Sequence, residues 1–386
     1  MKSLELFSGA GGLAKGLELA GFEHSAFVEF NRDACQTLRT NFDPAKVFEG
    51  DIRDYDFSGL AEIDLVAGGP PCQPFSMGGK HKASDDLRDM FPYAIKAISE
   101  LRPRFFIFEN VKGLLRASFA EYFEYIILRL EYPDCTDAGF ADWQDHLAKL
   151  RQLSSCADTP PEYNVEYQLI NAANYGIPQT RERVIVVGVR ADVGEAFTFP
   201  KAEHSLERLL WEQYVSGEYW ERHGLNAPLD YSHTPHFMRR IEAVRKKYGL
   251  IPPKSKPWVT MRDVLGHLPD PTTQNDIADH GFRDGAKSYP GHTGSMYDLP
   301  SKTIKAGAHG VPGGENMIRF SDDSIRYLTV HEAKIIQGFP ADFAIHGAWG
   351  EAMRQIGNAV PATLGRKIGD QIQKIISQES SSVKAA

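Results

Sequence analysis

Short apolar runs alternate with amphipathic stretches along the first 190 residues, and this alternation predicts a doubly wound, mostly parallel α/β sheet. Strands are expected at residues 4–7, 25–29, 63–68, 105–109, 166–170 and 184–189. Helices are expected over residues 13–20, ended by Gly21, and near residues 33–40. The solidly apolar run at 105–109 is typical of a strand that is covered on both faces.

The alternation of predicted strands and helices is interrupted in two places, and these interruptions suggest how the chain is divided into domains. Residues 1–196 are expected to form the first part of a catalytic domain, with a surface insertion of one helix at about 131–164. Residues 197–321 lack the alternation and are rich in Pro, Gly and His, which predicts a second, smaller domain. Residues 322–386 are expected to return to the catalytic domain, with helices over 329–337 and 361–377 and a frayed polar tail at 378–386.

The composition is that of an ordinary globular chain, with 42% hydrophobic and 24% charged residues among 386. No apolar run approaches the ~20 residues of a membrane helix, and the N-terminus does not resemble a signal peptide. Four cysteines without CxxC spacing argue against a zinc site or a disulfide scaffold and favour a reducing cytoplasm. The net charge is −8, but residues 231–262 hold eight Lys or Arg and one acid, so a local basic face is expected.

A glycine-rich turn follows the first predicted strand. Gly9 and Gly11 would let a ligand approach the backbone without interference from a Cβ atom. Glu29 ends the next strand, 20 residues after Gly9, where an acid can accept hydrogen bonds from a ribose diol. The pattern fits S-adenosylmethionine, NAD or FAD, and glycines kept for packing alone are the alternative.

Cys72 lies just past the end of a predicted strand, on the stiff segment Gly69-Pro70-Pro71. Ligands and chemistry gather at this edge of an open α/β sheet. A lone cysteine is usually an inert core residue, but one presented here favours a nucleophile.

The run Gly-Pro-Pro-Cys-Gln-Pro-Phe-Ser resembles the catalytic loop of DNA (cytosine-5) methyltransferases, of the bacterial modification type. Other motifs of that family follow in order. They are Phe-Ser-Gly-Ala-Gly-Gly from residue 7, Gly-Asp-Ile from 50, Phe-Glu-Asn-Val from 108, Gln-Thr-Arg-Glu-Arg from 179, Leu-Pro-Ser-Lys-Thr-Ile from 299 and Gln-Ile-Gly-Asn-Ala-Val-Pro from 355. The resemblance covers about residues 1–190 and 293–370, and leaves out 197–290.

The resemblance implies a methyl transfer from S-adenosylmethionine to C5 of a flipped-out cytosine, with S-adenosylhomocysteine as product. Cys72 would attack C6, Glu109 would donate a proton toward N3, and Arg181 and Arg183 would stabilise charge near O2. The donor would contact Phe7, Gly9, Gly11, Glu29, Phe30, Asp51, Ile52, Pro71, Asn358 and Val360. Gln73, Ser76 and Thr303 would contact DNA. The alternatives are a capping carboxylate for Glu109, surface ion pairs for the arginines and a solvated surface loop after Cys72.

Charge and periodicity, rather than the resemblance, add a further DNA contact. Residues 235–248 read as a helix with Phe237, Ile241, Val244 and Tyr248 at i, i+4, i+7 and i+11, an apolar stripe that is expected to face inward. Basic residues on another face would meet DNA phosphates: Arg239, Arg240, Lys246 and Lys247. The alternative is a solvated basic face.

The expected partner is double-stranded DNA, and the expected form is a monomer in the bacterial cytoplasm or nucleoid that needs neither a metal nor a membrane. The role would be the modification half of a restriction-modification system, with an endonuclease that is not held in a stable complex. An orphan regulatory methylase and a tRNA methyltransferase of the same fold are the alternatives. The chain lacks the Cys-Phe-Thr motif typical of the tRNA-acting relatives. Two other functions are weighed against this one. An NAD-dependent oxidoreductase would have no use for Cys72 beside Glu109 or for the basic face. A catalytically inactive DNA-binding module would not need Cys72, Glu109, Arg181 and Arg183.

Overall fold

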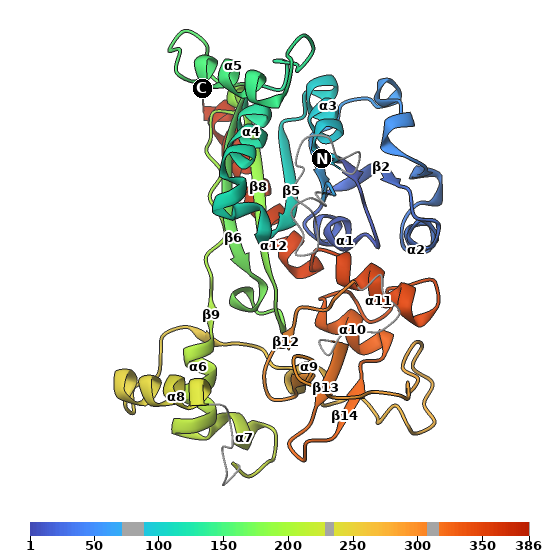
Figure 1. The fold of residues 1–386 in the computed structure, drawn as a ribbon, viewed down its shortest axis with the longest axis vertical. Coiled ribbons are helices and arrows are strands. Elements are labelled where there is room, and N and C mark those ends of the chain that lie inside the picture. Colours follow the sequence, from blue (N-terminus) through green and yellow to red (C-terminus); the bar gives the residue numbers. More distant parts are fainter. Residues whose placement is uncertain (72–88, 228–234, 307–315, 386) are drawn as a thin grey trace.

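The computed structural model describes residues 1–71, 89–227, 235–306 and 316–385. A seven-stranded sheet forms the upper part of the molecule in Figure 1, in the order β3-β2-β1-β4-β5-β8-β6. Its strands are β1 (Lys2–Leu6), β2 (Glu23–Glu29), β3 (Val47–Glu49), β4 (Leu65–Gly68), β5 (Phe105–Val111), β6 (Tyr163–Asn171) and β8 (Glu182–Arg190). The first five strands are parallel, and β8 runs antiparallel to both of its neighbours. The predicted doubly wound, mostly parallel sheet is therefore confirmed.

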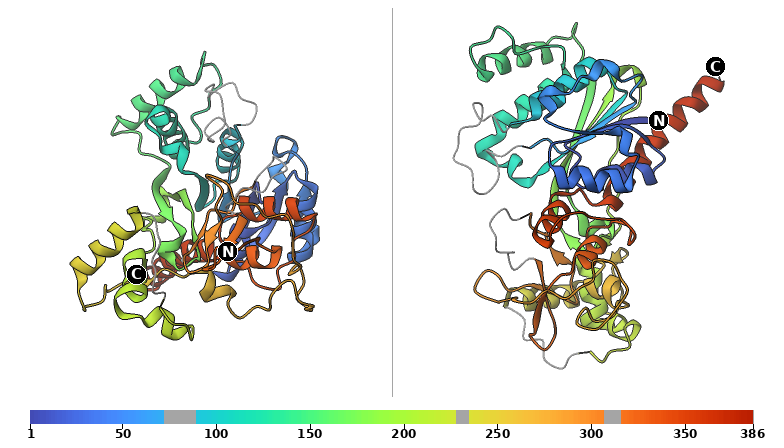
Figure 2. Two further views of the ribbon diagram at one scale, coloured as in Figure 1. Left: turned by 60° about the horizontal axis from the view of Figure 1, so that its bottom comes forward. Right: turned by 90° about the vertical axis from the view of Figure 1, so that its right-hand side faces the viewer.

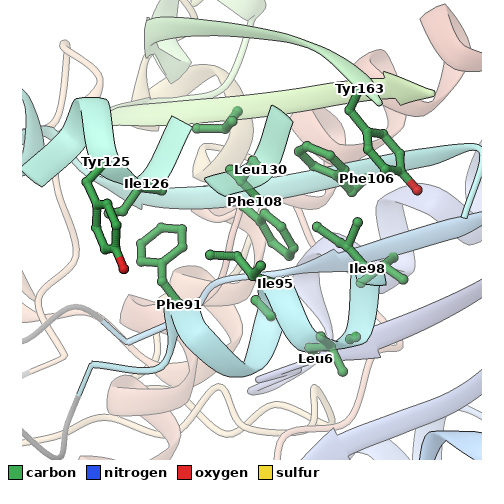
Figure 3. Packing of buried hydrophobic residues seen from close by; sticks show 14 of the residues in the cluster. Leu6, Phe91, Ile95, Ile98, Phe106, Phe108, Tyr125, Ile126, Leu130 and Tyr163 are labelled. Carbon is green, nitrogen blue, oxygen red and sulfur yellow. The ribbon is translucent and has the colours of Figure 1, made fainter. Parts of the chain in front are cut away.

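Helices cover both faces of this sheet. The helices of this part are α1 (Gly12–Leu19), α2 (Arg32–Asn41), α3 (Phe91–Leu101), α4 (Ala120–Glu131), α5 (Trp143–Ser154) and α12 (Ala362–Ala385). On one face, α3 and α4 pack on β1 and β5 through a core that includes Leu6, Phe91, Ile95, Phe106 and Phe108, and Figure 3 shows these side chains together. The other face packs against α1 and α12.

Glycine sets the close crossing of α1 and α12. A Cβ atom at Gly16 would come within 2.3 Å of the Ala362 carbonyl oxygen and 2.6 Å of the Arg366 amide nitrogen. The C-terminal helix is thereby held directly on the helix that follows the glycine turn, and Figure 2 shows it continuing beyond the sheet. The predicted frayed tail is wrong, because α12 extends to Ala385. No glycine or proline interrupts this Gln-, Glu- and Lys-containing run, and such residues favour helix.

The predicted helix of the insertion at 131–164 is α5, which packs on α4. Leu147 and Leu150 of α5 are buried in the same core as α3 and α4. The last residues of the insertion belong to the sheet, since β6 begins at Tyr163. The sequence did not predict β3, α3 or α4.

The lower part of the molecule holds short elements with small cores of their own (Figure 1). They are β9 (His204–Ser205), α6 (Leu206–Trp211), α7 (Glu218–Arg222), α8 (Pro235–Tyr248), β10 (Lys256–Pro257), α9 (Met261–Leu265), β11 (Ser295–Met296), β13 (Met317–Arg319) and β14 (Ile325–Tyr327). Two further helices, α10 (Val330–Ile336) and α11 (Trp349–Asn358), share a core with Met261 of α9 and Ile318 of β13. Packing is thus continuous across residue 321, where the sequence suggests a boundary.

Candidate active site

The turn between β1 and α1 is built from residues with positive φ. Phe7, Gly9 and Gly11 have φ values of 52°, 52° and 81°. At Gly11 a Cβ atom would lie 2.8 Å from the ring of Phe42, so only glycine fits there. At Gly9, by contrast, no atom of the described residues lies within 4 Å of a Cβ position. The backbone at Gly9 is therefore open to a ligand.

Glu29 ties this turn to the end of β2. One carboxylate oxygen accepts a hydrogen bond from the amide of Gly9 at 2.7 Å. The other accepts from the amides of Phe30 at 3.0 Å and Asn31 at 2.8 Å. The Phe30 ring beside them is 76% exposed. Glu29 thus fixes the shape of the predicted donor site, with an exposed aromatic ring at its edge.

The motif Gly-Asp-Ile, which holds the predicted donor contacts Asp51 and Ile52, directly follows β3. Asp51 accepts hydrogen bonds from the backbone and the side chain of Arg53, and this pairing lowers the pKa of the Asp51 carboxyl. Ile52 is buried in the sheet core. Both oxygens of the Asp51 carboxylate therefore accept hydrogen bonds within their own turn, and the buried Ile52 side chain fixes that turn to the sheet core.

Glu109 and Asn110 lie near the C-terminal end of strand β5, directly beside the segment that leads to Cys72. The Asn110 amide donates to the Pro70 carbonyl at 3.0 Å, and the Met90 amide donates to the Pro71 carbonyl at 3.1 Å. A Cβ atom at Gly69 would lie 3.5 Å from a Glu109 carboxylate oxygen. Residues 69–71, which lead to Cys72 in the sequence, therefore lie next to Glu109. Three predicted site residues, Cys72, Gln73 and Ser76, lie outside the described residues.

Two arginines meet Glu109 at this edge of the sheet. The antiparallel register pairs Val111 with Arg183, and Arg183 Nε lies 2.7 Å from Glu109 Oε1. Arg181 lies farther from the same oxygen, at 3.9 Å. Glu109 is only 8% exposed, and its Oε1 accepts no aligned hydrogen bond among the residues that the structure describes. The carboxyl group is therefore buried beside positive charge, with Arg183 as its nearer ion-pair partner.

The two arginines differ in their surroundings. Arg181 is buried, and it donates to the Gly357 carbonyl at 2.8 Å. Burial and the adjacent charge of Arg183 lower the pKa of the Arg181 guanidinium, while Glu109 opposes this shift. The Arg183 side chain is 16% exposed. Arg183 thus has the more exposed side chain of the two, and Arg181 is hydrogen-bonded to the backbone of the C-terminal motif.

The segments that carry the remaining motifs also come together. Strand β12 (Ser301–Lys302) pairs with β7 (Gln179–Thr180), which precedes the arginines. The Thr303 hydroxyl, a predicted DNA contact, donates to the Thr180 carbonyl at 2.8 Å. In the C-terminal motif Asn358 is exposed and Val360 is buried. A Cβ atom at Gly12 would lie 2.3 Å from the Val360 carbonyl oxygen, so this motif packs directly on the glycine turn.

The basic helix α8 has the predicted bounds and orientation. Ile241 and Val244 are buried in a small core, with Phe237 and Tyr248 packed against it. Arg239, Arg240, Lys246 and Lys247 are exposed. Lys247 also lies 3.4 Å from a Glu207 carboxylate oxygen and 4.8 Å from the ring centre of Tyr248. Arg239, Arg240 and Lys246 form no ion pair with another residue that the structure describes, so they are available to bind a polyanion.

Sequence reasoning missed Gln337, which ends α10. Its fully buried side chain joins Gln179 to the Ala359 carbonyl. Its position on the apolar face of a helix that otherwise packs inward was the available signal. Within the described residues no group of three or more His, Cys, Asp or Glu side chains could hold a metal ion, and no helix is long and apolar enough to span a membrane.

Comparison with known proteins matches this arrangement to one family. The model of the C-5 cytosine-specific DNA methylase family matches residues 1–133 and 147–374. The chain belongs to this family. It is therefore a DNA (cytosine-5) methyltransferase, as its motifs predict.

Relatives match this methyltransferase over nearly its whole length. The type II methyltransferase M.NgoMIV of Neisseria gonorrhoeae is 30% identical, and the alignment covers 98% of this chain and 99% of the relative. M.PspPI of a Psychrobacter strain is 31% identical over 97% of this chain and 79% of its own. The solved structure of the S. pombe Dnmt2 methyltransferase has a TM-score of 0.52 at 17% identity, covering 98% of this chain and 99% of its own, and so shares the fold.

Proposed function

We propose that the edge of the sheet around Glu109 is the catalytic centre for methylation of cytosine C5. The observation that carries this proposal is the buried Glu109 carboxyl group, whose Oε1 lies 2.7 Å from Arg183 Nε and which lies next to the segment that leads to Cys72. Glu109, Arg183 and the segment that leads to Cys72 are thus neighbours at one edge of the sheet, as their predicted roles require.

The chemistry explains why these three residue types are needed. C5 of cytosine is a poor nucleophile because the ring is aromatic. Addition of the Cys72 thiolate to C6 breaks the aromaticity and moves an electron pair toward N3 and O2. A protonated Glu109 would donate its proton to N3, and Arg183 would stabilise the charge on O2. After methyl transfer, loss of the C5 proton expels Cys72 and restores the aromatic ring.

Arg181 has a different role in this proposal. Its guanidinium is buried and donates to the Gly357 carbonyl. Arg183, by contrast, lies nearer to Glu109 and has the more exposed side chain of the two. We therefore assign the contact with O2 to Arg183 and the positioning of Glu109 and the C-terminal motif to Arg181.

The residues around the glycine turn fit S-adenosylmethionine as the methyl donor. The open backbone at Gly9 provides space for the ligand, and the exposed Phe30 ring provides a face for stacking. Glu29 accepts three backbone hydrogen bonds, which leaves one of its about four acceptor positions for a ribose hydroxyl. Asp51, Ile52, Pro71, Asn358 and Val360 would complete the site, together with Phe7 and Gly11. When bound, S-adenosylmethionine supplies the methyl group and leaves as S-adenosylhomocysteine.

DNA recognition would involve both parts of the molecule. A cytosine stacked in a duplex cannot offer C5 and C6 to opposite reactants, so the target base must flip out at a cost of a few kcal/mol. Thr303, whose hydroxyl donates to the Thr180 carbonyl, would hold the backbone at this edge against the DNA. Gln73 and Ser76 are proposed as further DNA contacts. The exposed basic residues of α8 would contact phosphates and hold the duplex.

The relatives favour the modification half of a restriction-modification system as the biological role, because they are named type II methyltransferases. In that role the enzyme would act as a monomer in the bacterial cytoplasm, without a stable complex with the endonuclease. The lower part at 197–321 would serve as the target-recognition domain.

Methylation mapping tests this function. Duplex DNA and tRNA are incubated with S-adenosylmethionine and either the wild type or Cys72→Ala, and 5-methylcytosine is then located by bisulfite sequencing. The proposal expects 5-methylcytosine within one short duplex sequence, none in tRNA, and none with Cys72→Ala. Methylation of tRNA alone, or activity in Cys72→Ala, would refute it.

A further inference from the structure

Two buried glutamine side chains, Gln179 and Gln337, join segments that are far apart in the sequence. Gln179 Nε2 donates to Gln337 Oε1 at 2.5 Å, and Gln337 Nε2 donates to the Ala359 carbonyl at 2.5 Å. At the other end, the Ile304 amide donates to Gln179 Oε1 at 3.3 Å. Both side chains are fully buried. The result is a chain of three hydrogen bonds through the interior.

The orientation of both amide groups is fixed by the two ends of this chain. The Ala359 carbonyl can only accept, so Gln337 must turn its nitrogen toward it and its oxygen toward Gln179. The Ile304 amide can only donate, so Gln179 must turn its oxygen toward it. The two requirements agree at the central bond. No other arrangement of the amides would satisfy every group.

The chain of bonds connects both substrate sites. Ile304 follows Thr303, a proposed DNA contact, and Gln179 lies on the strand that leads to Arg181 and Arg183. Ala359 lies between the proposed donor contacts Asn358 and Val360. A second bond runs beside the first, from Arg181 to the Gly357 carbonyl at 2.8 Å. A displacement of the segment 357–360 at the end of α11 would therefore also displace β7 and the backbone at residue 304.

We propose that Gln337 is a positioning residue that makes methyl-donor binding and DNA binding depend on each other. Gln337 touches neither substrate. It holds the segment 357–360 and the strand before the catalytic arginines in one relative position, so either ligand orders the contact that the other uses. This role rests on the proposed function, because the two ligands are those of the proposed site.

A purely structural role for Gln337 would have a different outcome. Loss of a buried hydrogen bond would lower stability, but it would not change how one ligand affects the other. Gln213 offers a matched control in the lower part of the molecule. It is also buried, and its Nε2 donates to a backbone carbonyl, that of Asp298, at 2.6 Å.

The experiment measures the dissociation constant of a duplex with the mapped target sequence, with and without saturating S-adenosylhomocysteine. The ratio of the two constants is the coupling factor, and it must equal the factor by which DNA changes the affinity for S-adenosylhomocysteine. Wild type, Gln337→Met and Gln213→Met are compared well below the melting temperature of each. We expect at least about fivefold coupling in wild type and in Gln213→Met, and less than about twofold in Gln337→Met.

The same coupling factor in Gln337→Met as in wild type would overturn the proposal, and so would a wild type that methylates DNA without coupling. If Gln337→Met does not fold, Gln337→Glu decides by the same criterion, because its carboxylate still accepts from Gln179 but cannot donate to Ala359. A wild type that makes no 5-methylcytosine would instead refute the proposed function, so the two failures are distinguishable.

Discussion

Replacing Glu109 with Gln tests the proposed acid, because Gln keeps the size of the side chain and loses the proton that N3 would receive. General acid catalysis is worth about 10²–10⁴-fold in rate. At about 1.36 kcal/mol for each factor of ten, that is about 2.7–5.4 kcal/mol of transition-state stabilisation. We expect the rate of a single methyl transfer to fall by such a factor, while DNA affinity changes little.

The structure also predicts a smaller cost in stability. In the free enzyme the Glu109 carboxylate lies 2.7 Å from Arg183 in a largely buried ion pair, and Glu109→Gln would leave two arginines close together without that carboxylate. A charge-assisted interaction of this kind is worth about 1.5–3 kcal/mol, so a lower melting temperature is expected as well. Glu182→Gln is the matched control, since Glu182 is in an exposed pair with Lys112 at 2.9 Å. A Glu109→Gln rate within about threefold of wild type, in a folded protein that binds DNA, would refute the reasoning.

Three further variants test the donor site, the fold and the basic helix. Glu29→Gln should raise the KM for S-adenosylmethionine more than it lowers kcat, and equal effects in steady-state kinetics would argue against a ribose contact. Gly16→Ala should destabilise the protein by about 1–3 kcal/mol in denaturant titration, because α1 and α12 cannot separate without cost. Gly59→Ala is the control, because the Cβ position of Gly59 faces open space, and it should leave the free energy of unfolding nearly unchanged. Similar losses of stability in the two variants would contradict the close packing of α1 on α12 at Gly16. Lys246→Ala should lower the slope of log affinity against log salt by about 0.9 in DNA titrations, and an unchanged slope would mean a solvated face.

The sheet and the edge that carries the proposed catalytic centre could be predicted because each depends on local sequence. Apolar runs give the strands, and parallel strands bring their ends to one edge, where Glu29, Glu109 and the approach to Cys72 lie. Strand β1 ends one residue earlier than expected, at Leu6, because Phe7 takes a positive φ at the start of the turn.

Contacts between distant segments could not be predicted in the same way. Asn110 was known only as part of a motif, and its bond to the Pro70 carbonyl depends on how β4 and β5 pair. Gln337 is a single polar residue at the end of an apolar helix face, and its hydrogen-bond partner Gln179 becomes evident only when α10 packs against β7. Likewise, four basic residues looked equivalent on α8, but Lys247 lies beside Glu207, a residue 40 positions away.

The covalent bond between Cys72 and cytosine is the central claim, and a trapping experiment tests it most directly. A duplex with 5-fluorocytosine at the mapped target is incubated with the enzyme and S-adenosylmethionine, and the adduct is digested and located by mass spectrometry. Fluorine cannot leave C5 as a proton does, so the intermediate should accumulate. The account predicts one adduct, on Cys72, that is absent in Cys72→Ala. An adduct on Cys35, Cys135 or Cys156, or no adduct from an enzyme that methylates the unmodified duplex, would contradict it.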